Sequence, residues 1–249
     1  MKVAIVFNHP YKQSFCNALL QSVLTGLHRA GHETDLLHLD DDGFNPVMTA
    51  ADLKGFTRGA PVDPQVIAYR QRLEQADHLV LIFPIWWELM PAMTKGFIDK
   101  VIYPGVAYDY DKSGRWPKMV KRWRRLQGVT LITTMNTPSL AYRLLFGNAI
   151  KKALFTGTFW KLGYRNRKWI RFSMVKFVSP EKRTRWLDKL ERRFTRLAPA
   201  ADNPPAPAAR NSPAPAAGNS PAPAAGNIRA PAAGNRCSTT VQIGGRVNA

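Results

Sequence analysis

The chain has 249 residues and a formal net charge of +19, from 36 Lys and Arg against 17 Asp and Glu. No apolar run approaches the ~20 residues that a membrane-spanning helix needs, and the chain opens on a strand-like run instead of a secretory leader, so we expect a cytoplasmic protein. The two cysteines, Cys16 and Cys237, have no C-x-x-C spacing and no ligand cluster around them. This disfavours a disulfide framework and a metal site.

Charge and composition both change along the chain. Residues 1–111 hold 9 basic and 13 acidic side chains, residues 112–196 hold 23 and 3, and residues 197–249 hold 4 and 1, so the middle stretch carries +20. From about Ala198 the sequence is rich in Pro, Ala, Gly and Asn with an eight-residue period. Such a segment cannot offset a chain entropy of roughly 1–2 kcal/mol per residue. We therefore predict a folded domain over residues 1–197 and a disordered tail over 198–249.

Within the folded part, short apolar runs alternate with longer amphipathic segments. The predicted strands are Lys2–Phe7, Glu33–Leu39, His78–Phe83, Val129–Thr134 and Trp169–Val175. The predicted helices run from Phe15 to Leu27, over Val66–Leu73, from Pro91 through Val101, over Tyr142–Leu154, and from Pro180 after an N-cap at Ser179. The first, third and fourth strands are apolar on both faces, as in a buried parallel sheet. The alternation indicates an α/β protein with a doubly wound, five-stranded parallel sheet.

Ligands of that architecture bind beyond the carboxyl ends of the strands, so the site is expected in the loops that follow them. The first loop, Asn8–Ser14, precedes a helix whose N-terminal N–H groups suit a phosphate, the alternative being an ordinary capped loop. The second loop, Phe83–Pro91, places Trp86 and Trp87 at a strand end, where at most one can face the core. A planar aromatic ligand would account for the other indole.

The second loop also carries a resemblance. FPIWWELMPAMTKGFIDKV at residues 83–101, with NHPYKQSF at residues 8–15, resembles the flavodoxin-like NAD(P)H:quinone oxidoreductases. Their pattern Phe-Pro-x-x-Trp-x-x-x-Pro-Ala-x-x-Lys-Gly-Phe/Trp is matched throughout, and the resemblance covers roughly residues 1–196. It implies a flavodoxin-like fold, FMN or FAD as cofactor, NADH or NADPH as electron donor, and two-electron ping-pong hydride transfer to a quinone. It also implies a homodimer.

The resemblance implies roles for single residues as well. His9, Ser14 and Phe15 would face the flavin phosphate, with Cys16 standing where the family commonly has Asn and with Asn17 beside it. Pro84, Ile85, Trp86 and Trp87 would border the flavin ring, and Thr133, Thr134, Met135 and Asn136 would line its pyrimidine side, without the glycines that the family has there. Tyr142 matches a catalytic tyrosine, and Asn148 replaces the accompanying histidine. Tyr108 and Tyr110 would wall the quinone.

The basic stretch, which includes Lys118–Arg125 and Lys161–Arg171, has several interpretations. The simplest is a solvated charged face. The next is a peripheral contact with an anionic membrane, because Trp123, Phe159, Trp160 and Trp169 lie among the cations as interfacial anchors do. Recognition of a nicotinamide 2′-phosphate would need only one or two of these residues. Nucleic-acid binding is disfavoured, because no known binding motif accompanies the charge.

The sequence thus predicts a flavin-dependent NAD(P)H:quinone oxidoreductase. Two alternatives stay open. One is a flavoprotein of the same fold that serves as a regulatory or ancillary subunit of a membrane transport system, and the other is a basic nucleic-acid-binding protein.

Overall fold

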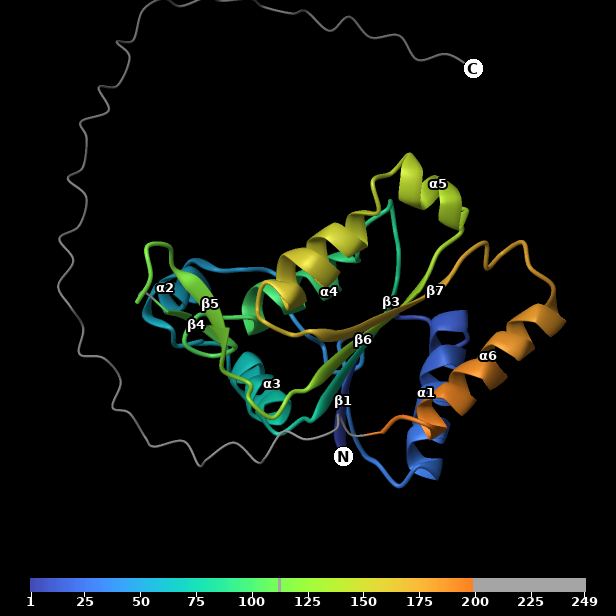
Figure 1. The fold of residues 1–249 in the computed structure, drawn as a ribbon, viewed down its shortest axis with the longest axis horizontal. Helices are drawn as coiled ribbons and strands as arrows, with labels where there is room; N and C mark the ends of the chain where they lie inside the picture. Colours follow the sequence, from blue (N-terminus) through green and yellow to red (C-terminus); the bar gives the residue numbers. More distant parts are fainter. Residues whose placement is uncertain (112, 199–249) are drawn as a thin grey trace, which may run out of the picture. The chain divides into compact units, whose positions relative to one another are not determined.

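A parallel sheet of five strands lies at the centre of the residues that this computed structural model describes, 1–111 and 113–198 (Figure 1). Its strands are β1 (Lys2–Phe7), β2 (Glu33–His38), β3 (His78–Pro84), β6 (Gly128–Thr134) and β7 (Asn166–Phe172). They are arranged in the order β2-β1-β3-β6-β7, and every neighbouring pair is parallel. This is the flavodoxin-like strand order, so the predicted fold class is confirmed.

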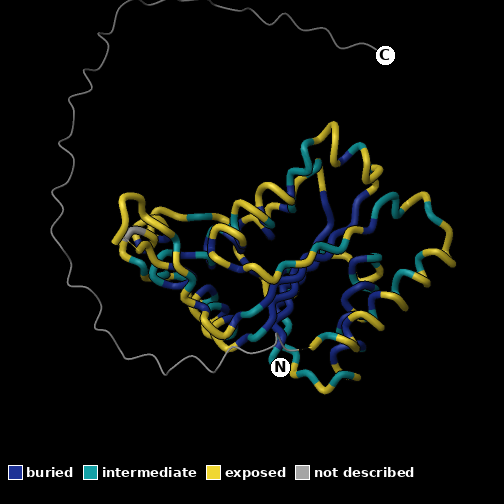
Figure 2. The backbone as a smooth tube through the Cα atoms, viewed as in Figure 1, coloured by how far each residue is buried: buried dark blue, intermediate teal, exposed yellow. Residues whose placement is uncertain are grey.

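Helices cover both faces of the sheet. One face packs against α3 (Pro64–Glu74), α4 (Ala92–Val101) and η1 (Lys151–Trp160), and the other against α1 (Phe15–Arg29) and α6 (Pro180–Thr195). Because both faces are covered, β3 and β6 bury every residue, and Figure 2 shows the central strands as buried chain. The loops that follow β1, β3 and β6 therefore leave a rigid core at one edge of the sheet.

Local capping signals fix where the helices begin. The hydroxyls of Ser14 and Ser179 and the carboxylate of Asp63 each accept a hydrogen bond from a backbone N–H in the first turn of α1, α6 and α3, respectively. Pro64 and Pro180 occupy the first turns of α3 and α6, where a missing N–H costs nothing. These signals explain why the predicted starts of α1 and α6 are confirmed.

One predicted helix is wrong. Instead of a single helix over Tyr142–Leu154, the chain forms α5 (Ser139–Leu144) and then η1, a helix of π type. Gly147 and Asn148 have positive φ values of 64° and 57°, which a continuous right-handed helix excludes. The break places Asn148 three residues before the start of η1.

Other elements differ in extent or were not predicted. β7 begins at Asn166 and ends at Phe172, earlier than the predicted Trp169–Val175, because an edge strand tolerates polar residues that hide its start. The chain also contains α2 (Ala50–Arg58) and an antiparallel hairpin of β4 (Tyr108–Asp111) and β5 (Lys118–Lys121).

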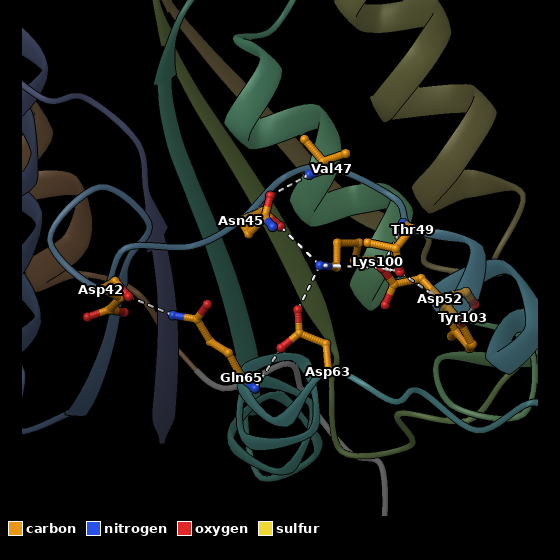
Figure 3. A network of polar contacts seen from close by, with 9 residues as sticks. All are labelled: Asp42, Asn45, Val47, Thr49, Asp52, Asp63, Gln65, Lys100 and Tyr103. Atoms are coloured by element: carbon orange, nitrogen blue, oxygen red, sulfur yellow. Dashed lines mark hydrogen bonds and ion pairs between the residues drawn. The ribbon is translucent and has the colours of Figure 1, made fainter.

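A buried ion-pair network holds the carboxyl end of α4 (Figure 3). Lys100 is 2% exposed, donates to Asp63 Oδ2 at 2.6 Å and to the carbonyl of Asn45 at 3.1 Å, and lies 3.7 Å from Asp52 Oδ2. Asp63 caps α3, and Asp52 forms the capping box of α2 with Thr49. Burial alone would raise the pKa of Asp63, but hydrogen bonds from Lys100 and from backbone N–H groups hold it below its usual value. The network fastens α2, α3 and α4 together.

No helix within residues 1–111 and 113–198 is long and apolar enough to cross a bilayer. The predicted tail, 198–249, lies outside the described residues except for its first position. The division into a folded domain over 1–197 and a tail therefore stays a prediction.

Candidate functional site

The three predicted loops meet at the carboxyl edge of the sheet. Phe7 of β1 pairs with Ile82 of β3, and Pro84 at the end of β3 pairs with Thr134 of β6, so the loops leave the sheet side by side. The His9 ring in the first loop lies 6.2 Å from the Trp86 ring in the second. The second loop is tied to the third, because Glu88 Oε1 accepts a hydrogen bond of 2.7 Å from the Thr137 hydroxyl.

The first loop delivers the N-terminus of α1 to this edge. Ser14 Oγ accepts a hydrogen bond of 3.1 Å from the N–H of Asn17, which leaves the N–H groups of Phe15 and Cys16 without an intrahelical acceptor. Free N–H groups and the positive end of a helix dipole attract a phosphate. The Phe15 ring packs against Phe172 instead, with 5.9 Å between centroids, so only its main chain is available to a ligand.

The next two residues of α1 use their side chains internally. The Cys16 thiol is buried and lies 3.1 Å from Thr134 Oγ1, which links α1 to β6. Burial raises the pKa of Cys16 to about 11, so the thiol stays protonated at neutral pH. Asn17 Nδ2 donates to the carbonyl of Lys12 at 2.5 Å and closes the first loop.

His9 lies beside the α1 N-terminus. Its Nδ1 accepts a hydrogen bond of 3.1 Å from the N–H of Tyr11. Burial lowers the pKa of His9 and outweighs the opposing effect of Asp40. A neutral ring that accepts at Nδ1 carries its proton on Nε2, so His9 can donate to an anion without being charged.

The second loop is a tight turn in an unusual conformation. The N–H of Trp86 donates to the carbonyl of Leu89 at 2.9 Å, and the N–H of Leu89 donates back to Trp86 at 3.0 Å. Between them Trp87 and Glu88 have φ values of 49° and 64°. Two consecutive left-handed residues define a type I′ turn, which normally contains Gly or Asn. Such strain, ~1–3 kcal/mol for each residue, is typical of ligand-binding sites.

The turn presents both indoles to solvent. Trp87 is 98% exposed and Trp86 is 47% exposed. The sequence allows at most one of them to face the core, and in the structure neither indole does. Two adjacent exposed indoles leave more apolar aromatic surface available than the sequence predicts.

A buried tyrosine holds this turn in place. The Tyr142 hydroxyl donates to the carbonyl of Glu88 and accepts from the N–H of Ile150, both at 3.0 Å. Tyr142 is fully buried, and burial raises its pKa. Asn148 lies just after the carboxyl end of α5, and its N–H donates to the carbonyl of Tyr142 at 2.9 Å. Of the two residues predicted as catalytic, Tyr142 therefore holds the turn directly, and Asn148 contacts the main chain of Tyr142.

Two buried acceptors at this place lack a partner among the described residues. They are Glu88 Oε2 and Asn148 Oδ1. A buried polar atom without a hydrogen bond costs about 1–3 kcal/mol, so a donor from a ligand would stabilise either one. Glu88 was not among the predicted site residues, although an isolated charge in an otherwise apolar loop is a signal that sequence reasoning can use.

The third loop follows β6, on the side of β3 away from β1. Thr133, Thr134 and Met135 are buried, Thr133 accepts from Trp169 Nε1 at 3.0 Å, and the carbonyl of Thr134 accepts from the N–H of Ile85 at 2.8 Å. Asn136 is exposed, and its Oδ1 accepts from the N–H of Lys176 at 3.1 Å. Of this loop, Asn136 alone among the four predicted residues offers its side chain to a ligand.

The predicted substrate tyrosines lie elsewhere in the chain. Tyr108 and Tyr110 belong to the β4–β5 hairpin, which follows the carboxyl end of α4, whereas the Trp86–Leu89 turn precedes its amino end (Figure 1). A helix of this length separates its ends by about 15 Å. Tyr108 is also buried, while Tyr110 is half-exposed. Within one chain the structure therefore does not bring these tyrosines to the Trp86–Leu89 turn, and their contact with a quinone stays a prediction.

The interpretation of the basic stretch also changes. Trp123 and Phe159 are buried, so the prediction that they are interfacial anchors is wrong. Arg122 pairs with Asp109 and Arg125 with Asp77, which neutralises part of this charge inside the chain.

The residues of the site fit a flavin. The N–H groups at the α1 N-terminus that lack an intrahelical acceptor suit a phosphate, and the exposed indoles suit a planar ring system. Glu88 Oε2, which has no partner among residues 1–111 and 113–198, suits a ring N–H donor. The Pro84 and Ile85 main chain borders the same space at the end of β3.

Comparison with known proteins agrees with this geometry. A family model described as "Flavodoxin-like fold" matches residues 1–197. The chain is 28% identical to NAD(P)H dehydrogenase (quinone) 1 of Rattus norvegicus over 125 residues, which cover 44% of this chain and 46% of that protein. It is 32% identical to the uncharacterized NAD(P)H oxidoreductase YcaK of Escherichia coli over 132 residues, 51% of this chain and 64% of that one. The crystal structure of Smu.1420 from Streptococcus mutans matches with a TM-score of 0.67 and 29% identity, over 79% of this chain and 100% of that chain.

The chain spans about half the length of the rat relative and 64% of the Escherichia coli one.

Proposed function

The chain belongs to the flavodoxin-like fold family over residues 1–197, and from that premise we propose that it is a flavin-dependent oxidoreductase that uses NADH or NADPH to reduce a quinone or a related aromatic acceptor. The observation that carries the proposal is that the loop leading into α1 lies beside the turn with two exposed indoles, with 6.2 Å between the His9 and Trp86 rings. The names of the rat and Escherichia coli relatives support the choice of electron donor.

The first loop would hold the phosphate of FMN or FAD. The N–H groups of Phe15 and Cys16 and the neutral His9 ring supply donors without a fixed positive charge. Trp86 and Trp87 would stack beside the ring system and the acceptor, with the main chain of Ile85 along one edge. When bound, the flavin supplies two-electron hydride chemistry between nicotinamide and quinone, in ping-pong order.

The residues around the turn position it and move no proton. Tyr142 is fully buried, and its hydroxyl is already engaged as both donor and acceptor. Asn148 has no titratable group. We therefore assign both residues to positioning the Trp86–Leu89 turn, with Asn136 as the polar side chain of the third loop that faces a ligand.

The purified full chain provides the test. We expect a flavin absorbance spectrum, a released cofactor whose mass decides between FMN and FAD, and turnover of a soluble quinone with NADH or NADPH. The proposal would be refuted if the chain takes up no flavin on reconstitution and turns over no quinone. Stoichiometric flavin without quinone turnover would favour the ancillary subunit of a membrane transport system. Nucleic-acid binding without flavin would favour the basic nucleic-acid-binding protein.

The phosphate position has a matched pair of variants. Ser14→Asp keeps a good N-cap residue but places a negative charge beside the proposed phosphate, so we expect at least tenfold weaker flavin binding at unchanged thermal stability. Ser179→Asp makes the same change at the N-cap of α6, where the hydroxyl also accepts a backbone N–H, and should leave flavin affinity unchanged. Equal flavin affinity in both variants would place the phosphate elsewhere.

Two expectations about assembly belong to this proposal. A homodimer would cover the exposed indoles of Trp86 and Trp87, and sedimentation equilibrium measures it. Peripheral contact with an anionic membrane would use α5, where Leu140, Leu144 and Leu145 are exposed beside Arg143. Co-sedimentation with acidic but not with neutral vesicles, lost at high salt, is the expected result for membrane contact.

A further inference from the structure

A groove of about 870 Å³ runs between β7 and α6, and at its Phe172 end it reaches the start of α1, where the Phe15 ring packs on Phe172. Five consecutive residues of β7, from Lys168 to Phe172, line it. Successive side chains of a strand point to opposite faces of a sheet, so five in a row share one groove only where the groove follows the strand edge. β7 is the last strand of the sheet and pairs with β6 alone among the described residues.

The backbone of β7 offers hydrogen bonds along this free edge. The Phe172 carbonyl accepts from the N–H of Met135, so the main-chain groups of Phe172, and of Ile170 two residues before it, face β6. Those of Arg171 and Trp169 therefore face the groove. A row of outward N–H and C=O groups is a template for an added strand.

The groove is strongly cationic. The charged residues that line it are Lys168, Arg171, Lys189, Arg192, Arg193 and Arg196, and within residues 1–111 and 113–198 no Asp or Glu lines it. All six are exposed, and none has an ion-pair partner within the described part of the chain. On α6, Trp186, Lys189, Leu190 and Arg193 recur at helical spacing and form one stripe toward the strand.

An alternative explanation is that cations on an edge strand prevent edge-to-edge pairing with another chain and bind nothing. Here four of the six are at the carboxyl-terminal part of α6, where strand pairing would not require them. Their mutual repulsion is relieved by an anionic occupant, and Arg is the side chain best suited to bind carboxylates in pairs.

We propose that the groove binds an extended acidic peptide segment of a partner protein, which adds as a strand beside β7 and pairs its carboxylates with the cations of α6. A single strand matches the outward main-chain groups, and small apolar side chains on alternate residues would contact Ile170 and Trp186. Single-stranded nucleic acid fits less well, because its bases stack on free aromatic rings. Here Trp186 packs on Phe172, and Trp169 lies under the Arg171 guanidinium and donates to Thr133.

The experiment uses the full chain and a fluorescein-labelled, end-blocked peptide of alternating Glu and Val, eight residues long, in an anisotropy titration at physiological salt. We expect saturable binding that the triple variant R192Q/R193Q/R196Q weakens at least tenfold. The control triple variant R122Q/R124Q/R125Q removes the same charge outside the groove, and its affinity should stay within twofold of wild type. Matching thermal transitions show that both variants are folded.

A second probe separates strand addition from unspecific charge attraction. Peptides with N-methyl groups on every second residue, in either of the two phases, keep all carboxylates but remove half of the main-chain donors. We expect one phase to bind at least tenfold more weakly than the other. Equal affinity of both phases, or equal losses in the two triple variants, would overturn the proposal. The proposal would also be overturned if the chain binds a ten-nucleotide oligothymidylate or acidic vesicles more strongly than it binds the peptide.

Discussion

At its carboxyl end α4 carries Lys100, which is buried and meets two carboxylates and a carbonyl (Figure 3). At its amino end lies the Trp86–Leu89 turn, which has two left-handed residues, two exposed indoles and a buried carboxylate oxygen that finds no partner in the described part of the chain. The first region contains the satisfied polar contacts that stabilise a fold, and the second keeps strain and unused hydrogen-bonding capacity. One helix thus joins a region built for stability to one suited to binding, and variants at each end should separate the two.

The largest effect is expected from Lys100→Met. Removing the buried ammonium leaves the buried Asp52 and the partly buried Asp63 without their cation, so the free energy of unfolding should fall by about 3–5 kcal/mol. Urea denaturation measures the change. Lys95→Met is the control on the same helix, because Lys95 pairs with Asp99 at the surface and should cost less than about 1 kcal/mol. Similar losses in the two variants would contradict the stabilising role of the network.

His78, at the amino end of β3, is a second buried polar group with a satisfied contact. Its Nε2 lies 2.9 Å from Thr130 Oγ1, and burial lowers its pKa to about 4, with smaller effects from Lys168 and His32. The ring is neutral in the folded chain but takes up a proton near pH 6.5 when unfolded. The contribution of the neutral His78 ring to the free energy of unfolding is therefore complete above pH 6.5 and is lost as the pH falls toward 4. It amounts to on the order of 3 kcal/mol in total.

Urea titrations at several pH values test this for wild type and His78→Gln. The glutamine variant should show a shallower loss of stability between pH 6.5 and 4, because it binds no additional proton on unfolding. If the free energy of unfolding falls with pH in parallel for the two proteins, His78 does not titrate in this range.

Much of the fold was predictable, because β1, β3 and β6 are apolar on both faces and Ser14 and Ser179 are strong N-cap residues. The meeting of the three loops was predictable too, since parallel strands bring their following loops to one edge. The conformation of the site was not. It depends on the hydrogen bond from Tyr142 to Glu88, which joins residues 54 positions apart, and no local pattern reports such a contact.

The Trp86 and Trp87 pair gives the next largest effect. Replacing both with Ala should weaken flavin binding about tenfold or more, because aromatic contacts of this kind contribute ~0.5–1.5 kcal/mol each beyond the area that they bury. The thermal transition should change little, since both side chains are exposed. Trp116→Ala is the matched control, an exposed indole outside the three loops. A double variant with full flavin occupancy and undiminished quinone turnover would remove these indoles from the site.

The smallest effect is expected from Trp87→Gly, and it concerns the strain itself. Trp87 has a φ of 49° and is 98% exposed, so its side chain adds almost no packing to the fold while its backbone occupies a region that L residues avoid. Glycine adopts this conformation at no steric cost, and the free energy of unfolding should therefore rise by about 1 kcal/mol. Flavin affinity should fall at the same time, because the indole is lost and the turn becomes freer to move. A rise in the free energy of unfolding, measured by urea denaturation, together with a fall in flavin affinity, measured by titration, would show that the turn is maintained for binding at the expense of stability. A fall in both quantities would mean that the Trp87 indole supports the fold, and the contrast between the two ends of α4 would then be one of degree.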